Sequence, residues 1–323
     1  MTMLTLSRQA EGAPPRGDGG RLLARLLAEM HATASASSIR AFDGDVNRAI
    51  LFMAIARESG ILSGLSDGHA IPEGRGQGRA ISINALAASM SRPFETVRRH
   101  VNALIEDDLC VRTPAGVMVP AAVHSRPDVA AQFRIHHDVL VRLIEDMAWF
   151  DMPLPKTRAS VRYDWRTGLV AAHDILLTGL EFHAWRFPSW LDLVLVATIL
   201  CANARPFVYD REVALKFAEF DAPPPEGMRV PVPASFIARS LGLPPSTTQR
   251  RVNLLIEGGA LVREASGVIV STSAEEDIAT IDASRTSNDH TRQIFARLAA
   301  GGFRFDDPAR CYLESRPEPT PFH

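Results

Sequence analysis

An internal repeat constrains this chain of 323 residues more than any other feature. The segment 81–119 aligns without a gap with the segment 232–270, at a constant offset of 151 positions. The two segments share 15 identical residues over 39 positions, whereas unrelated segments of average composition would share about two or three. The identities include R-x-V-N-x-L-I-E and the trailing V-R-x-x-x-G-V-x-V. Two copies of one structural unit are therefore expected in tandem within a single polypeptide.

The sequence on both sides of each 39-residue core extends the repeat. Apolar segments with helical spacing precede each core, and long segments with apolar residues three and four positions apart follow it. We expect a mobile N-terminal tail over 1–19 and a C-terminal tail over 301–323, of which the end after about Arg316 is mobile. Between these tails, the expected divisions are a first unit over 20–150 with its core at 81–119, a connector over 151–164, and a second unit over 165–300 with its core at 232–270.

Each core has the pattern of a helix, a turn, a second helix and a β-hairpin. In the first core, Ser91 before Arg92-Pro93 suits an N-cap with proline in the first turn of the second helix. That helix carries its apolar residues at i, i+4, i+7 and i+8, starting from Val97. The expected strands are 109–112 and 117–119 in the first core and 261–263 and 268–270 in the second. The pattern predicts a mainly α fold with two tandem winged helix-turn-helix units, each with a small β-hairpin wing and flanking long helices.

The pattern A-x-S-(M/L)…P-x-x-T-x-x-R-x-V-N-x-L-I-E…V-R-x-x-x-G resembles the DNA-binding domains of bacterial MarR-type and IclR-type regulators. The resemblance covers the two cores well and the flanking helices in outline. It implies that the second helix of each core enters the major groove of double-stranded DNA. The hairpin would then rest on the adjacent backbone or minor groove. The function expected from this resemblance is that of a sequence-specific transcriptional regulator.

The outward face of each second helix carries residue types that read DNA. At about 100° per residue, Arg99 lies almost opposite the apolar stripe, and Arg250 takes the equivalent place in the second copy. Arginine suits guanine, glutamine suits adenine, and serine or threonine can contact bases or phosphates. Because the two copies present different side chains, they are expected to read different half-sites, or only one of them reads bases. The candidate DNA-binding residues on or beside the outward face are Arg92, Glu95, Thr96, Arg99, Ser246, Thr247, Gln249 and Arg250, and Leu243 lies on the same face. Arg98 and Arg251 lie toward the flanks, where phosphate contacts are expected.

Two features depart from the pattern of such regulators. The wing tips, 113–116 and 264–267, contain no Arg or Lys, and the acidic run Glu106-Asp107-Asp108 follows the first recognition helix. Arg75 and Arg79 are expected to supply phosphate contacts in place of the wing tips. Winged helices also serve as protein-interaction modules, so a tandem winged-helix scaffold without base-specific DNA binding is the alternative function. The presence of Arg99 and Arg250 favours the regulator.

Tryptophan is concentrated between the two cores. All four, Trp149, Trp165, Trp185 and Trp190, lie there with phenylalanines beside them. Two interpretations are open: an aromatic core or dimer interface between the units, or a pocket for an apolar or aromatic small-molecule effector. The terminal helices of each unit also favour a homodimer, although the two units could instead act as a covalent pseudo-dimer within one chain.

Composition and motifs exclude several other classes of protein. Lys+Arg 35 against Asp+Glu 37 gives a formal net charge of −2, which leaves only local basic patches for binding DNA. Three scattered cysteines and no CxxC indicate reduced intracellular thiols. Without HExxH, GxSxG or Walker motifs, and without the glycine-rich cofactor site of a methyltransferase, we expect no enzyme, metal or cofactor. The apolar run 191–204 is interrupted by Asp192 and too short for a bilayer, so a cytoplasmic protein without membrane contact is expected.

Overall fold

The computed structural model describes residues 17–60, 79–158, 160–187 and 189–322. Within these ranges the protein is mainly helical, with two small antiparallel hairpins, which confirms the mainly α character and the hairpins of the predicted fold. Residues 1–16, and with them most of the expected N-terminal tail, lie outside the described part of the chain, as does Arg75.

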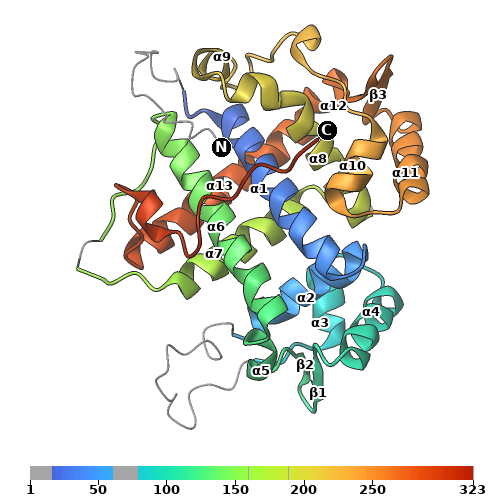
Figure 1. Ribbon diagram of the computed structural model, residues 1–323, viewed down its shortest axis with the longest axis vertical. Coiled ribbons are helices and arrows are strands. Elements are labelled where there is room, and N and C mark those ends of the chain that lie inside the picture. The colour runs from blue at the N-terminus through green and yellow to red at the C-terminus, as the bar shows by residue number, and fades with distance from the viewer. Residues whose placement is uncertain (1–16, 61–78, 159, 188, 323) are drawn as a thin grey trace.

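The two halves of the chain contain the same elements in the same order (Figure 1). The helices α10 to α13 each begin 151 positions after their counterparts α3 to α6, so the repeat continues through the last helix of each half. Between α8 and α10 lie α9 (Arg211–Lys216) and a short 3-10 helix (Glu226–Met228); the corresponding stretch of the first half includes residues 61–78, which lie outside the described ranges. The first half comprises α1 (Gly20–Ala41), α2 (Val46–Glu58), α3 (Ile83–Ser89), α4 (Phe94–Glu106), β1 (Val111–Thr113), β2 (Gly116–Met118), α5 (Ala121–His124) and α6 (Pro127–Trp149). The second half comprises α7 (Trp165–Phe182), α8 (Trp190–Val208), α10 (Ala234–Leu241), α11 (Pro245–Glu257), β3 (Leu261–Glu264), β4 (Gly267–Val270), α12 (Thr272–Glu275) and α13 (Ile278–Ala300).

Each hairpin is joined by a third extended residue that precedes the helix pair. Val111 pairs with Met118 in the first hairpin, and Leu261 pairs with Val270 in the second. An antiparallel bridge then adds Ile81 to the first hairpin, and the equivalent bridge adds Val232 to the second. This close approach explains a glycine that both copies keep: a Cβ atom on Gly116 would lie 2.2 Å from the carbonyl oxygen of Ile81.

The two halves share their hydrophobic core. The helix α1 packs along α8 of the other half as well as α6 of its own, and α7 packs along both α13 and α6. One buried cluster includes Leu104 of α4, Leu195 of α8 and Leu255 of α11. The expected boundaries at 20–150 and 165–300 therefore mark the repeat, and the two units do not have separate cores.

The segment after α13 corrects the expectation of a C-terminal tail, because it crosses the molecule and packs against it (Figure 1). Phe303 is fully buried, and the backbone N–H groups of Leu313 and Glu314 donate to Asp138 at 2.9 and 3.0 Å. Beyond Arg316, the buried Arg142 donates to the carbonyl oxygen of Pro317 at 3.0 Å. Apolar burial and hydrogen bonds to buried polar groups hold this segment, and neither is visible as a local periodicity.

The helix α8 lies at the centre of this arrangement. Among the described helices it alone is long and apolar enough to cross a membrane, with a mean hydropathy of 1.6, and 72% of that stretch is buried inside the protein. Burial of this kind is typical of the core helix of a globular fold.

Candidate nucleic-acid interface

The second helix of each helix pair begins with a proline-based turn. The helix α4 starts at Phe94 with Pro93 as its N-cap, and α11 starts at Pro245 with Pro244 as its N-cap. Neither helix has a side-chain cap, so the predicted role of Ser91 as N-cap is wrong. Ser91 instead takes a left-handed conformation, with φ of 50°, within the turn.

Arg99 and Arg250 lie at equivalent positions on α4 and α11, and both side chains are exposed. Neither forms an ion pair with a carboxylate in the part of the chain that the structure describes. Nη2 of Arg99 lies 3.4 Å from Nε2 of the adjacent His100. Both guanidinium groups are thus available to a ligand outside the protein.

The neighbours of these two arginines differ between the copies, as predicted. On α4, Arg98 forms an ion pair with Glu95 at 2.7 Å, so these two candidate residues neutralise each other. On α11, Gln249 donates to Asn253 at 3.0 Å. The remaining candidates, Thr96, Ser246 and Thr247, lie at the surface or are half-buried.

A pair of hydrogen bonds that sequence reasoning missed joins each hairpin to its helix. Nη2 of Arg112 on β1 donates to Oδ1 of Asn102 on α4 at 2.8 Å. Nη2 of Arg263 on β3 donates to Oδ1 of Asn253 on α11, also at 2.8 Å. All four residues belong to the identities of the repeat, so the signal was present as N-x-L-I-E…V-R in both copies.

The structure places Arg92, which was predicted on the outward face, and Arg251, which was predicted on its flank, against α8. The guanidinium of Arg92 lies over the ring of Trp190, 4.5 Å from its centroid. Arg251 forms a two-point ion pair with Asp192, in which the Nε to Oδ1 distance is 2.7 Å. Both arginines thus pack on the beginning of α8 instead of projecting toward DNA. Leu243, also expected outward, is 6% exposed because it belongs to the core.

The start of α8 therefore lies between the two helix pairs. Trp190 contacts the turn before α4, and two residues later Asp192 holds α11. A reciprocal contact runs the other way, since Nη2 of Arg40 at the end of α1 donates to the carbonyl oxygen of Ser240 in α10 at 2.5 Å. The helix pair of each half is thus held by the other half.

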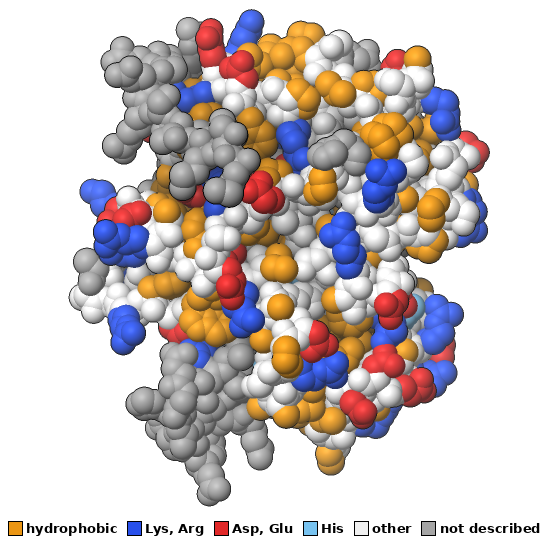
Figure 2. All heavy atoms as spheres, in the orientation of Figure 1, with side chains coloured by type: hydrophobic (Ala, Val, Ile, Leu, Met, Phe, Trp, Pro, Cys, Tyr) orange, Lys and Arg blue, Asp and Glu red, His pale blue; other side chains and the backbone are white. Residues whose placement is uncertain are grey.

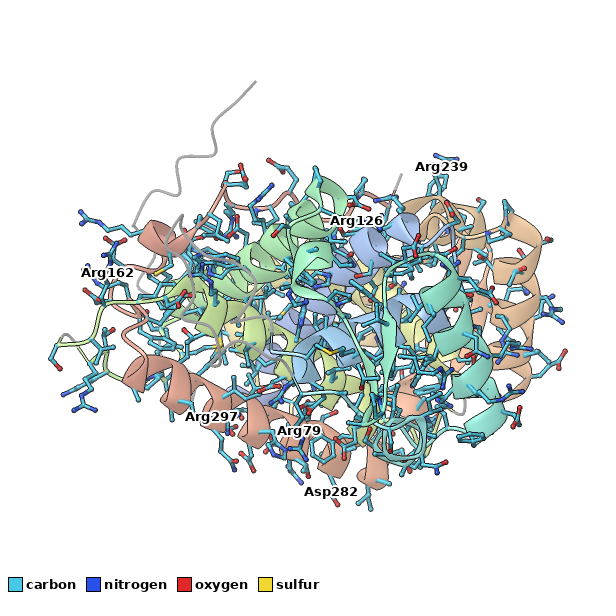
Figure 3. The ribbon with its side chains drawn as sticks, turned by 90° about the horizontal axis from the view of Figure 1, so that it is seen from below. Arg79, Arg126, Arg162, Arg239, Asp282 and Arg297 are labelled. Atoms are coloured by element: carbon cyan, nitrogen blue, oxygen red, sulfur yellow. The ribbon has the colours of Figure 1, made fainter. Side chains whose placement is uncertain are left out.

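Both candidate recognition helices face the same side of the molecule. Figure 1 shows α4 and α11 along one edge, with the β1–β2 hairpin below and β3 above. Along that edge, Lys and Arg side chains alternate with acidic ones (Figure 2). Arg79 is exposed and lies on the face that also carries Arg297 and Asp282 (Figure 3).

The four tryptophans do not form one aromatic cluster. Trp149 lies against Phe150 with ring centroids 4.5 Å apart, and Trp165 contacts His137 at 6.4 Å. Trp185 is 55% exposed, whereas Trp190 is 3% exposed. None of the four lines the pocket of about 170 Å³ between α1, α7, α8 and α13.

Buried histidines are a further feature, at α5 and α6 of the first half and at α7 of the second. Nδ1 of His136 lies 2.9 Å from Nε2 of His173, and both side chains are almost fully buried. His124 is fully buried, and its ring nitrogens have no hydrogen-bond partner among the described residues. Burial lowers the pKa of His124 and that of His136 to about 4, and it lowers the pKa of His173 well below its usual value. No group of three or more His, Cys, Asp or Glu in the described ranges is placed to hold a metal.

Comparisons of the chain with protein-family models, with curated proteins and with solved structures found no match.

Proposed function

We propose that this chain is a sequence-specific DNA-binding transcriptional regulator that presents two winged helix-turn-helix units. In this proposal, α3 with α4 and α10 with α11 are the two helix-turn-helix motifs, and the β1–β2 and β3–β4 hairpins are the wings. The α4 and α11 helices read bases in the major groove through their exposed faces.

The observation that carries the proposal is the equivalence of Arg99 and Arg250. Each is exposed at the same position of a repeated helix, and neither has a carboxylate partner among the described residues. Elsewhere on these helices arginines are used internally: Arg98 pairs with Glu95, and Arg251 pairs with Asp192. An exposed guanidinium kept in both copies suits recognition of guanine O6 and N7.

The contacts of α8 support a fixed arrangement of the two helix pairs, α3 with α4 and α10 with α11. Because Trp190 and Asp192 sit one helical turn apart or less, the helix pairs that they contact are fixed relative to each other. A fixed separation lets both helices contact one duplex in a single register. Figure 1 is consistent with this arrangement, since α4 and α11 share one edge of the molecule.

The assembly state remains a prediction, and two states are open. The packing of α1 on α8 and of α7 on α6 supports a covalent pseudo-dimer within one chain, whereas the sequence favoured a homodimer with four recognition helices. Sedimentation at micromolar concentration distinguishes them: a single species of 35.3 kDa supports the pseudo-dimer, and a species of twice that mass supports the homodimer.

The tandem winged-helix scaffold is the second candidate function, and it has specific support. Glu95 neutralises Arg98 on the outward face of α4, and the wing tips carry no Arg or Lys. These features reduce the positive charge that a phosphate backbone requires.

A binding experiment with DNA separates the two candidates. Fragmented DNA from the source genome and a random-sequence duplex library are each offered to the purified chain at low salt. A regulator enriches particular sequences, and its binding weakens steeply as salt rises, because phosphate contacts release counterions. If no bound fraction forms at low salt, the regulator proposal fails in favour of the scaffold.

A further inference from the structure

A pocket of about 170 Å³ lies between α1 of the first half and α7, α8 and α13 of the second half. Its walls are mainly aliphatic, with Leu27 from α1 and Leu193, Val196 and Leu200 from α8. One end is different, because the side chains of Arg21, Arg25 and Glu275 line it. The pocket is therefore amphipathic, with an apolar body and a charged end.

The charged end has a surplus of buried positive charge. Arg21, Arg25 and Arg229 are 5%, 6% and 6% exposed, and the half-buried carboxylate of Glu275 lies among them. Nη2 of Arg229 lies 2.6 Å from that carboxylate, and Nη1 of Arg21 lies 3.8 Å from it. Glu276 and Asp221 also act on Arg21, and burial raises the pKa of Glu275. A buried cation that lacks a counter-charge is strongly destabilising, so this end of the pocket favours an anion.

Of these three arginines, Arg25 forms the fewest hydrogen bonds and ion pairs with the protein. Its Nη1 donates to the carbonyl oxygen of Phe217 at 3.1 Å, and its guanidinium lies over the ring of Phe207 at 5.0 Å. Within the described ranges no carboxylate lies within ion-pair distance of it. Burial lowers the pKa of Arg25 to about 10, so the group is still protonated at neutral pH. A guanidinium has five N–H donors, which leaves several for a ligand.

The first half provides an internal comparison, because its equivalent positions are filled by large side chains. The pocket-lining Ser284 and Ser287 on α13 correspond to Phe133 and His136 on α6, at the offset of 151 that relates these helices. Phe133 and His136 are each 1% exposed. The second half thus has serine side chains at two positions where the first half has large, buried side chains. These smaller side chains contribute to the volume of the pocket.

We infer that this pocket is a binding site for a small apolar carboxylate, whose anionic group pairs with Arg25 and whose hydrocarbon part lies against α8. The size is appropriate, since an apolar cavity of about 150 Å³ is sufficient to hold benzene. Bidentate pairing with a carboxylate is the geometry that a guanidinium supplies best. The inference does not depend on DNA binding.

The wall formed by α8 gives the pocket a connection to α11. Leu193 lines the pocket, and the residue before it, Asp192, holds Arg251 of α11. Ala260 and Val270, which follow α11 and end β4, also line the pocket. A ligand here would touch the elements that position the second candidate recognition helix.

The test measures binding to the full chain in the absence of DNA. Hexanoate and benzoate are titrated up to about 10 mM, with hexanamide and benzamide as neutral probes of the same shape, and ligand-observed NMR or calorimetry reports saturation. At least one carboxylate is expected to saturate and to bind about tenfold more tightly than its amide.

Three variants locate the site. Arg25→Gln is expected to remove the preference for carboxylate over amide. Ser284→Phe, which copies Phe133 of the first half, is expected to abolish binding of all four probes. Arg162→Gln removes one exposed positive charge outside the pocket and is expected to change nothing (Figure 3).

The inference is overturned if neither carboxylate saturates the wild-type chain, if the amides bind equally well, or if folded Arg25→Gln keeps the preference. The comparison of carboxylate with amide uses the wild-type chain, so it holds even where a variant does not fold. The titration contains no DNA, so failure to bind a carboxylate would not contradict the proposed DNA binding. Failure to bind DNA would likewise not contradict carboxylate binding in this pocket.

Discussion

Arg112 donates a hydrogen bond to Asn102 at 2.8 Å, and this bond between hairpin and helix is repeated by Arg263 and Asn253 at the same distance. Each bond fixes a wing at a set angle to its helix. It also holds an exposed guanidinium beside the helix face that carries Arg99 or Arg250. In the proposed function, the wing base, and not the wing tip, would supply positive charge to the backbone of DNA, and the repetition of this geometry supports that role.

Arg112→Ala is therefore expected to weaken binding to all DNA sequences about equally and to lower the slope of log affinity against log salt by about one. Asn102→Ala removes the hydrogen bond but keeps the charge, so it is the matched control and should leave the slope unchanged. The measurement is affinity for preferred and scrambled duplexes at several salt concentrations. A change in base preference for Arg112→Ala, with no change in slope, would contradict this role.

Arg250 and Arg251 are neighbours with opposite roles, and stability measurements should separate them. Arg251→Ala leaves the buried Asp192 without its ion-pair partner and is expected to cost about 2 kcal/mol of unfolding free energy. Arg250→Ala removes an exposed side chain and should stay within about 0.5 kcal/mol of the wild type. Urea unfolding at neutral pH measures both. Equal effects of the two changes would show that the Asp192 pair does not anchor α11.

The buried histidines predict a loss of stability in mild acid. The folded-state pKa values of His124 and His136, about 4, lie below the unfolded value of about 6.5, so the unfolded chain binds more protons between these limits. The stability that depends on the neutral rings is complete above pH 6.5 and is lost as the pH falls toward 4. Each histidine contributes a slope approaching about 1.4 kcal/mol per pH unit in this window.

His124→Phe tests this assignment, because the ring of His124 has no hydrogen-bond partner among the described residues. The variant is expected to lose about 2 kcal/mol less stability than the wild type between pH 7 and pH 5. Urea unfolding at both pH values gives the comparison. An unchanged difference between the two pH values would mean that His124 titrates normally in the folded protein.

The C-terminal segment is expected to stabilise the whole fold. A chain that ends at Tyr312 loses the Pro317 carbonyl that accepts from the buried Arg142, and the contacts of Arg316 with Glu145 and Asp146 at 2.5 Å. We expect a loss of more than about 2 kcal/mol in urea unfolding. Arg310→Ala, which removes only an exposed i,i+3 pair with Asp307, serves as the control. A truncated chain as stable as the full one would restore the interpretation of this segment as a tail.

Local patterns in the sequence predicted the elements but not how the halves meet. The duplication placed α3, α4, α10, α11 and both hairpins within a few residues, because each depends on short-range periodicity and turn chemistry. The same reasoning placed Arg92 on the outward face and Arg251 on its flank, because helix geometry alone cannot show that Trp190 and Asp192 of α8 approach from the side. The packed C-terminal segment was missed for the same reason, since its partners Asp138 and Arg142 lie 175 positions away along the chain.

The central claim is that Arg99 and Arg250 read bases, and one measurement tests it most directly. Affinity for the preferred duplex and for scrambled DNA is measured for the wild type, Arg99→Ala and Arg250→Ala. Each variant is expected to lose about 1–3 kcal/mol of binding free energy on the preferred duplex, while its affinity for scrambled DNA changes little. The two variants are expected to lose base preference at different base pairs. If the ratio of specific to non-specific affinity is unchanged in both variants, α4 and α11 do not read bases, and the proposed function is contradicted.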